Sequence, residues 1–257
     1  WKACFFDFQV KAVSLAAHHL HVRGGVLLAD VVGLGKTLMA TAVAKITQED
    51  EGGAALVICP PTLVDMWNAY VQKYELAGQV VSLGMVTKVL PDLKRYRLLI
   101  IDESHNLRNR DGARYQAIRD YIEENEPRCL LLTATPYNKE YVDIGNQLRL
   151  LIDERRDLGV RPERYFEQED ERDFAVRFQA PSRSLMAFEQ SPYPEDWRDL
   201  LRLYMVRRTR EFVIENYAQY DSIRERHYVT FSDGTPSHFP LREPKTVPFA
   251  IQESDPN

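Results

Sequence analysis

The stretch DVVGLGKT, residues 30–37, follows an apolar run at 25–29 and opens a helix-forming segment at 38–46. A strand, a glycine-containing turn, a Lys-Thr pair and a helix, in that order, are the parts of a phosphate-binding P-loop. Gly33 and Gly35 would let the backbone turn tightly, so that successive N–H groups converge on phosphate oxygens at a helix N-terminus. The stretch therefore predicts a nucleotide-binding α/β domain. The alternative is an ordinary glycine-rich turn between a strand and a helix.

The residues of this loop have distinct expected roles. Lys36 is expected to hold the β- and γ-phosphates of a nucleotide, and Thr37 a Mg²⁺ ion. The chain departs from the strict pattern at one position, because Asp30 stands where the pattern has glycine.

The overall composition predicts a soluble globular protein. Of 257 residues 44% are hydrophobic, and 33 basic residues face 38 acidic ones, for a net charge of −5. A polyanionic partner would therefore have to meet a local basic patch, because the net charge does not attract it. The three cysteines are widely separated, and Cys59 and Cys129 lie in apolar runs. They are predicted to be small buried residues in a reducing compartment.

No apolar stretch approaches the ~18 residues that a membrane span needs, and no basic-then-apolar leader is visible. We therefore expect no membrane partner and a cytoplasmic location, nucleoid-associated in a prokaryote or nuclear in a eukaryote. The sequence begins at Trp1 without a methionine, which suggests a piece of a longer protein.

The order of predicted elements indicates a parallel sheet covered by helices on both faces. Continuously apolar strands are predicted at 26–29, 54–59, 79–83, 97–101 and 128–132. Helices are predicted at 7–22, 38–46, 62–74, 113–124, 142–152 and 194–206. Functional residues of such a sheet belong at the carboxyl ends of its strands, and the polar motifs fall there.

From about Asp153 the sequence becomes more charged and less periodic. We predict a boundary at this point, with a nucleotide-binding lobe at 1–155 and an appended part of the same lobe at 156–257. The second part is expected to hold a helical insertion and a short β segment, with a strand at 227–231 and a returning strand at 245–251.

A second polar motif, DESH at 102–105, follows the predicted strand 97–101. In a P-loop enzyme a strand-end aspartate helps to hold Mg²⁺, and the next acidic residue orients or deprotonates the attacking water. Asp102 and Glu103 fit these roles. The alternative is a solvated loop or a helix cap, which is less attractive because the P-loop and this motif each predict the other.

A third motif, TATP at 133–136, also stands at a strand end. Its hydroxyls, on Thr133 and Thr135, could link the nucleotide site to a second ligand. Threonines at such positions also serve as helix caps, so this motif is not specific by itself.

Taken together, the motifs resemble the first motor lobe of Swi/Snf-type ATPases of helicase superfamily two. The resemblance rests on Gln9, DVVGLGKT, ICPPTLVDMW (58–67), DESHNLRN (102–109), LLLTATPYN (130–138) and YMVRRT (204–209), and runs from about Phe8 to Arg208. Asp30 is usual in this family, whereas Val31 replaces the usual glutamate. The resemblance implies a RecA-like α/β lobe, ATP and Mg²⁺ as cofactors, and double-stranded DNA as the partner.

Residue roles follow from the resemblance. The nucleotide site would comprise Gln9, Asp30, Gly33, Leu34, Gly35, Lys36, Thr37 and Leu38. Gln9 would read the adenine; the alternative is an exposed glutamine in a first helical turn. The catalytic set would be Lys36, Asp102, Glu103 and His105, with Thr37 and Asp102 on Mg²⁺. His105 would couple the ATP state to the nucleic-acid track through the TATP threonines; the alternative is a loop histidine with one local hydrogen bond.

Nucleic-acid contact is expected mainly through phosphates, with little base specificity. The expected contact and coupling residues are Pro61, Thr62, Ser82, Thr133 and Thr135. A basic cluster at 94–97 is more simply a solvated face. A second cluster, Arg207, Arg208 and Arg210, matches a segment that closes the lobe, so a packing or interlobe role is expected. Trp67 is expected to anchor its helix to the sheet.

A second RecA-like lobe, which in this family supplies arginines that complete the ATP site, is missing from this chain. We therefore predict weak ATP binding and little hydrolysis, because such an arginine contributes roughly 10³ to 10⁵ in rate. Two other functions stay open at this point. One is a DExH-type unwinding helicase acting on DNA or RNA, and the other is a nucleotide-dependent binding switch.

Overall fold

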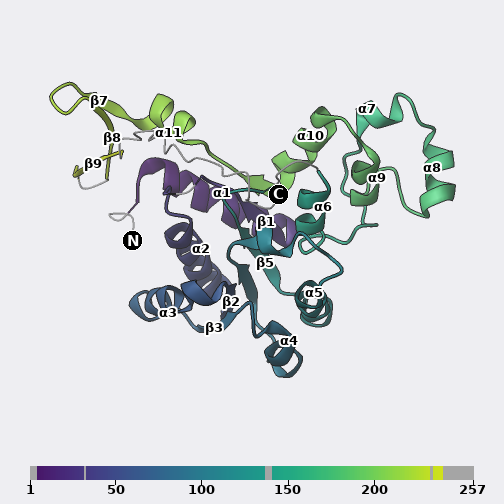
Figure 1. Ribbon diagram of the computed structural model, residues 1–257, viewed down its shortest axis with the longest axis horizontal. Coiled ribbons are helices and arrows are strands. Elements are labelled where there is room, and N and C mark those ends of the chain that lie inside the picture. The colour runs from purple at the N-terminus through teal and green to yellow at the C-terminus, as the bar shows by residue number, and fades with distance from the viewer. Residues whose placement is uncertain (1–4, 32, 137–140, 232–233, 240–257) are drawn as a thin grey trace, which may run out of the picture.

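The computed structural model describes residues 5–31, 33–136, 141–231 and 234–239. Its centre is a sheet of six parallel strands in the order β3-β2-β4-β5-β1-β6 (Figure 1). The strands are β1 (Gly25–Leu28), β2 (Ala55–Cys59), β3 (Gly78–Ser82), β4 (Leu98–Ile101), β5 (Arg128–Leu132) and β6 (Met205–Val206). Every residue of β1, β2 and β4 is buried, because helices cover both faces of the sheet.

The two faces of the sheet have separate apolar cores. One face packs against α1 (Asp7–Arg23), α2 (Lys36–Glu51) and α3 (Val64–Lys73). The other packs against α4 (Val86–Val89), α5 (Ala113–Asn125), α6 (Val142–Leu148), α9 (Leu185–Gln190) and α10 (Pro194–Tyr204). Successive strand residues alternate between the faces: Leu27 lies in the second core, and Val26 and Leu28 in the first.

Short 3₁₀ turns follow three of the strands. They are η2 (Pro61–Leu63) after β2, η3 (Leu90–Asp92) after β3 and α4, and η4 (Ser104–Leu107) after β4. The turns η2 and η4 begin within a few residues of a strand's carboxyl end, so they carry the polar motifs of that edge of the sheet.

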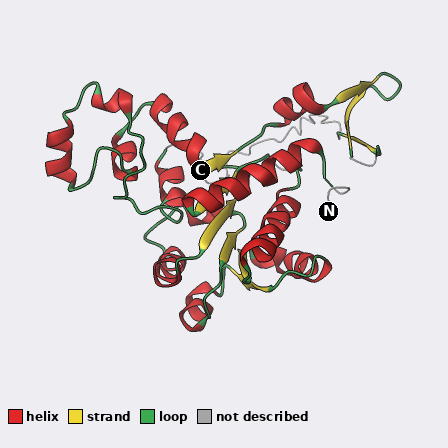
Figure 2. Cartoon of the chain, turned by 180° about the vertical axis from the view of Figure 1, so that it is seen from behind, coloured by secondary structure: helices red, strands yellow, loops and turns green. Residues whose placement is uncertain are grey.

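Two arms project from the lobe on opposite sides of its centre (Figures 1 and 2). One arm contains α7 (Glu163–Phe166), α8 (Glu171–Phe178) and α9, and has a small aromatic core around Phe174. The other contains α11 (Arg210–Tyr217) and an antiparallel sheet of β7 (Gln219–Asp221), β8 (Arg226–Thr230) and β9 (Pro236–His238). The predicted fold, a mainly parallel α/β lobe with a helical insertion and a short C-terminal β segment, is confirmed.

Some predicted element boundaries are wrong. Met205 and Val206 do not continue the helix predicted at 194–206; they form β6, which pairs with Leu27 and Leu28. The free edge of β1 offers these two residues backbone partners that the local sequence cannot reveal, as in the bond from Ala29 N–H to Val206 C=O (2.8 Å). The helix predicted at 142–152 ends at Leu148 and continues as turns.

In the C-terminal part, the strand predicted at 227–231 corresponds to β8. The returning strand predicted at 245–251 lies outside the described residues, and the strand that pairs with β8 on the return is β9. The sequence reasoning missed α11 and β7. Within the described ranges, no helix has the length and apolar character needed to cross a membrane.

Candidate nucleotide-binding site

The three polar motifs meet at one edge of the sheet. The P-loop follows β1, DESH follows β4 and TATP follows β5, and β5 lies between β1 and β4. Because all three strands are parallel, their carboxyl ends lie side by side, which is where ligands bind in open α/β sheets.

The P-loop has the backbone of an anion-binding turn at its described residues. Gly33 and Gly35 have φ of 89° and 81°, values that favour glycine, and α2 begins immediately after them at Lys36. A Cβ at Gly35 would stand 2.5 Å from the side-chain nitrogen of Gln9, whereas at Gly33 it would meet nothing within 4 Å. The loop is therefore closed toward Gln9 and open on the outer side of Gly33.

Gln9 connects the start of α1 to this loop. Its Nε2 donates to the carbonyl of Leu34 (3.0 Å), and its Oε1 accepts from the N–H of Phe6 (3.0 Å). The side chain is 5% exposed, so the alternative of an exposed glutamine is wrong. Gln9 fixes the loop's position, while contact with adenine stays a prediction.

Asp30 is fully buried at the base of the loop. Its Oδ1 accepts from the N–H of Arg208 (2.6 Å), and its Oδ2 has no hydrogen-bond partner in the part of the chain that the structure describes. Burial raises the pKa of this carboxyl, although Arg208 and Lys36 oppose the shift. Arg208 thus has a packing role, as its sequence position suggested.

The Lys36 ammonium group lies over the same residue. Its Nζ donates to the carbonyl of Asp30 (2.8 Å). Burial lowers the pKa of Lys36, and the carboxylates of Glu103, Asp30 and Asp102 oppose that change. An ammonium has three N–H donors, so two remain for an incoming anion beside the loop.

Asp102 is held by hydrogen bonds at both carboxylate oxygens. Trp67 Nε1 donates to Oδ2 (2.8 Å) and the N–H of Glu103 donates to Oδ1 (2.8 Å). Trp67 is fully buried against the sheet, so its predicted anchoring role is confirmed. The hydrogen bond from Trp67 to Asp102 was not predicted. A signal for it existed, because Trp67 is on α3, which follows β2, and β2 pairs with β4, which precedes Asp102. Glu103 itself has a left-handed backbone, with φ of 51°.

His105 joins the DESH and TATP motifs. Its Nδ1 lies 3.1 Å from Glu103 Oε2 and 3.3 Å from Thr133 Oγ1. Thr133 Oγ1 also accepts from the N–H of Thr135 (3.1 Å). The alternative of a histidine with one local contact is therefore wrong, because Thr133 follows β5, whereas His105 lies in η4 after β4.

Comparison with known proteins shows a similarity to one family. Residues 8–88 match the family described as SNF2-related domain. The similarity to Swi/Snf-type proteins extends beyond this segment, at lower identity. The resemblance drawn from the motifs is confirmed.

Similar proteins occur in bacteria and eukaryotes. The chain is 31% identical over 150 residues to an uncharacterized ATP-dependent helicase, YqhH, of Bacillus subtilis, covering 51% of this chain and 26% of the relative. It is 26% identical over 239 residues to the human SWI/SNF-related matrix-associated actin-dependent regulator of chromatin subfamily A containing DEAD/H box 1, covering 78% and 22%. Helicase swr1 of Schizosaccharomyces pombe is 25% identical over 224 residues, covering 75% and 17%. The chain thus spans about a quarter or less of these relatives.

A solved structure supports the fold. The Sulfolobus solfataricus SWI2/SNF2 ATPase core in complex with dsDNA superposes with a TM-score of 0.59 at 18% identity, covering 85% of this chain and 50% of that one. At this identity the likeness concerns the fold alone.

The residues of this chain that are predicted to contact nucleic acid lie at the same edge of the sheet. Pro61, Thr62 and Thr135 are exposed, and Ser82 is half-buried with its Oγ accepting from Gly84 N–H (3.3 Å). The basic cluster at 94–97 precedes β4 and therefore lies at the opposite edge. The structure thus separates that cluster from the candidate site.

Several side chains that support the motifs were missed. Arg108 Nη2 donates to the carbonyl of Thr135 (2.5 Å), and Asn146 Nδ2 donates to the carbonyl of Arg108 (2.6 Å). Ser104 donates to the buried Gln147 (2.8 Å), which in turn donates to the carbonyl of Pro136 (2.5 Å). The α6 helix therefore holds the ends of DESH and TATP together. Only the pairing of distant segments reveals this, and no local pattern marks it.

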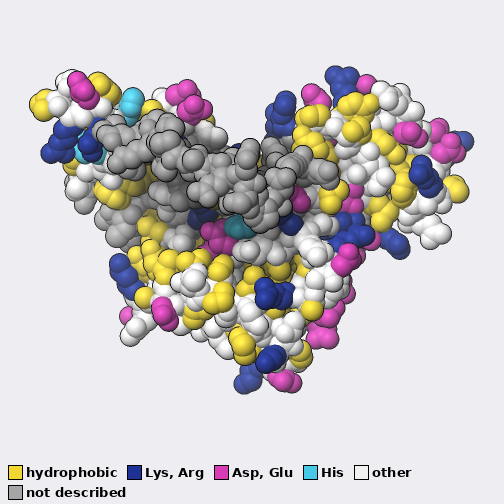
Figure 3. Space-filling view, in the orientation of Figure 1, with side chains coloured by type: hydrophobic (Ala, Val, Ile, Leu, Met, Phe, Trp, Pro, Cys, Tyr) yellow, Lys and Arg dark blue, Asp and Glu magenta, His cyan; other side chains and the backbone are white. Residues whose placement is uncertain are grey.

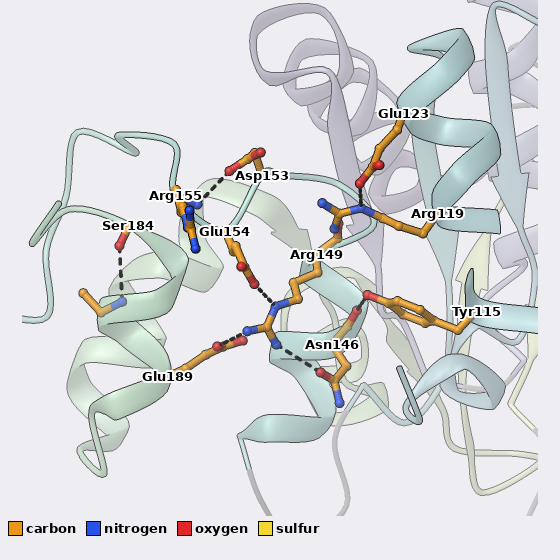
Figure 4. A network of polar contacts seen from close by, with 11 residues as sticks. Tyr115, Arg119, Glu123, Asn146, Arg149, Asp153, Glu154, Arg155, Ser184 and Glu189 are labelled. Atoms are coloured by element: carbon orange, nitrogen blue, oxygen red, sulfur yellow. Dashed lines mark hydrogen bonds and ion pairs between the residues drawn. The ribbon is translucent and has the colours of Figure 1, made fainter. Parts of the chain in front are cut away.

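The helical arm is attached to α6 through Arg149 (Figure 4). The guanidinium group pairs with Glu154 (2.8 Å) and Glu189 and donates to Asn146 Oδ1 (3.1 Å). Arg149 is 10% exposed, and burial raises the pKa of Glu189. Because Glu189 is on α9, this network fixes the arm to the helix behind TATP.

The donor set fits a magnesium nucleotide. No group of three or more His, Cys, Asp or Glu side chains among the described residues is placed to hold a metal ion by itself. A hydroxyl on Thr37 and a carboxylate on Asp102 are hard oxygen donors of the kind Mg²⁺ uses together with substrate phosphates. The open outer side of the loop and the spare donors of Lys36 leave room for those phosphates.

Proposed function

We propose that this chain is the N-terminal ATP-binding lobe of an ATP-dependent translocase that moves on double-stranded DNA. The observation that carries the proposal is the contact of His105 with Thr133, which links the acidic motif beside the P-loop to a second motif at the same edge. The names of the relatives support an ATP-dependent helicase-like activity, and the dsDNA complex of the Sulfolobus core supports the choice of partner.

Each side chain of the site has a defined task in this proposal. Lys36 exchanges the Asp30 carbonyl for phosphate oxygens, and the N–H groups of the loop hold the remaining negative charge. Thr37 and Asp102 would hold Mg²⁺, which when bound neutralises charge on the phosphates. Glu103 orients the attacking water and accepts its proton, and Trp67 keeps Asp102 in one orientation.

The coupling step passes through the histidine. His105 Nδ1 contacts both Glu103 and Thr133, so when Glu103 takes a new partner at the nucleotide, the contact with Thr133 is the one that remains. Thr133 holds the backbone of Thr135, which is exposed toward the proposed track. A change at the nucleotide thereby reaches the nucleic acid through two hydrogen bonds.

The isolated chain is proposed to bind ATP but to hydrolyse it very slowly. The resemblance assigns the arginines that would serve the transferring phosphate to a second RecA-like lobe. The loss of such an arginine costs roughly 10³ to 10⁵ in rate. A steady-state assay of the 257-residue chain should therefore show almost no turnover. Turnover of about 1 per second that Lys36→Ala abolishes would overturn this part of the proposal.

ATPase assays on a protein that includes a second lobe distinguish the translocase from two other functions. Stimulation of the ATPase by single-stranded DNA or RNA more than by duplex DNA would indicate an unwinding helicase of the DExH type. Unchanged turnover in a Glu103→Gln variant would indicate a nucleotide-dependent switch. Strong stimulation by duplex DNA, lost in Glu103→Gln, is the result expected for a translocase.

A further inference from the structure

An arginine-lined cavity lies beside β6, outside the candidate nucleotide-binding site. It has a volume of about 380 Å³ and is lined by Tyr141, Pro194, Trp197, Arg198, Leu201, Arg202, Met205 and Arg207. Three of these eight residues are arginines and none is acidic. In a chain with a net charge of −5 this is a local basic surface.

Two of the arginines are available for a ligand. Arg198 and Arg207 are exposed, and neither forms an ion pair with any residue in the described ranges. Arg202 is bonded to Asp199 (3.1 Å). Figure 3 shows Lys and Arg side chains over α10, the helix to which Arg198 and Arg202 belong. A guanidinium group that no carboxylate neutralises favours a phosphate or carboxylate partner.

A stacked pair of aromatic rings lines the cavity. Tyr141 stacks on Trp197 with ring centroids 5.1 Å apart and an interplanar angle of 9°. Trp197 is buried and its Nε1 donates to the carbonyl of Ser191 (3.1 Å), so its ring is not available to a base. The guanidinium groups of the cavity suit contact with the phosphates of a nucleic-acid backbone.

The cavity is joined to the P-loop by β6 and by the residues that follow it, Arg207 and Arg208. The carbonyl of Val206 accepts from Ala29 N–H (2.8 Å), and the carbonyl of Arg208 accepts from Val31 N–H (3.3 Å). Arg208 N–H donates to Asp30 Oδ1 (2.6 Å). Val206 and Arg208, the neighbours of Arg207, are thus hydrogen-bonded to residues 29–31 at the start of the P-loop. Lys36 donates to the backbone carbonyl of Asp30 in the same segment.

We propose that this arginine pocket contacts the phosphate backbone of nucleic acid and that its occupancy changes the affinity of the P-loop for nucleotide. The proposal rests on the proposed function, because it assumes that the lobe engages nucleic acid. Nucleic acid is favoured over an acidic peptide because the same edge carries the exposed hydroxyls of Thr62 and Thr135, which can contact further phosphates.

The test measures binding of a short fluorescent DNA duplex to the 257-residue chain by anisotropy at several salt concentrations. The test variant is Arg198→Ala/Arg207→Ala. The control is Arg155→Ala/Arg172→Ala, which removes the same charge from two exposed arginines outside the pocket. Each lost phosphate contact lowers the slope of log affinity against log salt by about 1. We expect a decrease of about 2 in the test variant and a much smaller one in the control.

A second readout is the affinity for a fluorescent ATP analogue with and without saturating duplex. The wild-type chain should show a difference, and the test variant should lose it while keeping the affinity measured without DNA. An unchanged salt slope in the test variant, or an equal decrease in the control, would overturn the proposal and leave the proposed function standing. The absence of any duplex binding by the wild-type chain would overturn both. Poly-glutamate that binds wild type and the control variant more tightly than the duplex does, and binds the test variant only weakly, would instead assign the pocket to an acidic protein.

Discussion

Replacing Trp67 by phenylalanine removes one hydrogen bond from Asp102 while leaving an aromatic ring in the core. The bond from Trp67 Nε1 to Asp102 Oδ2 is 2.8 Å long and buried. A hydrogen bond to a charged group contributes about 1.5–3 kcal/mol. The smaller ring adds the cost of a cavity, so a total loss of about 3 kcal/mol is expected.

Trp197→Phe is a matched control for this change. Trp197 is equally buried, but its Nε1 donates to the neutral carbonyl of Ser191 (3.1 Å). The ring atoms lost are the same, so the cavity terms nearly cancel, and a neutral bond contributes about 0.5–1.5 kcal/mol. The Trp67 variant should be less stable than the control by about 1–1.5 kcal/mol, or about 2–6 °C in Tm.

The two variants should differ more in ligand binding than in stability. With Trp67→Phe one oxygen of Asp102 loses its fixed orientation, so the affinity for a fluorescent ATP analogue should become less dependent on Mg²⁺. Trp197→Phe should keep the wild-type dependence. Calorimetric melting and a fluorescence titration at several Mg²⁺ concentrations measure the two effects. An unaltered Mg²⁺ dependence in Trp67→Phe, or the same change in both variants, would refute the reasoning.

Three further predictions concern the loop, the arm and α1. Gly35→Ala should destabilise the fold by about 1–2 kcal/mol because the backbone φ at this position is 81°. The new Cβ would also stand 2.5 Å from Gln9 Nε2. Adding Gln9→Ala should therefore recover part of the lost stability, measured by urea unfolding. Arg149→Met should lower the stability by about 3 kcal/mol because it leaves Glu189 buried without its cation. The double variant with Glu189→Met should regain most of this stability. Equal stability of the single and double variants would contradict the prediction. Burial and Arg23 lower the pKa of His19 in the folded state. Below a pH of about 6.5 the folded chain therefore binds fewer protons than the unfolded chain. The stability of the fold falls as the pH decreases from that value. Between neutral and acidic pH, the melting temperature of His19→Gln should fall less than that of wild type. Parallel curves of melting temperature against pH would show that His19 is not the cause of the loss.

The motifs predicted the sheet and the location of the site because both depend on local chemistry. A strand followed by Gly33, Gly35 and Lys36 can form few other structures, and DESH and TATP follow buried strands in the same way. Parallel strands then bring their carboxyl ends together whatever the details of the helices between them. The edge of the sheet was therefore predictable before any contact was known.

What was missed depends on contacts between distant segments. Met205 and Val206 form a strand only because β1 has a free edge, and their local sequence continues a helix. The support of Asp102 by Trp67 crosses 35 positions, and the contact of Asp30 with Arg208 crosses 178. Such pairs leave no periodic signal in one sequence, although each joins residues that the motifs had already marked.

The central claim is that Lys36 and its loop bind the phosphates of ATP in this chain without help from a second lobe. The most direct test is an equilibrium titration of the 257-residue chain with a fluorescent ATP analogue in the presence of Mg²⁺, comparing wild type with Lys36→Ala. Saturable binding by wild type that Lys36→Ala abolishes, with unchanged melting behaviour of the variant, is the predicted result. Binding of equal strength by the variant, or none by wild type, would contradict the claim.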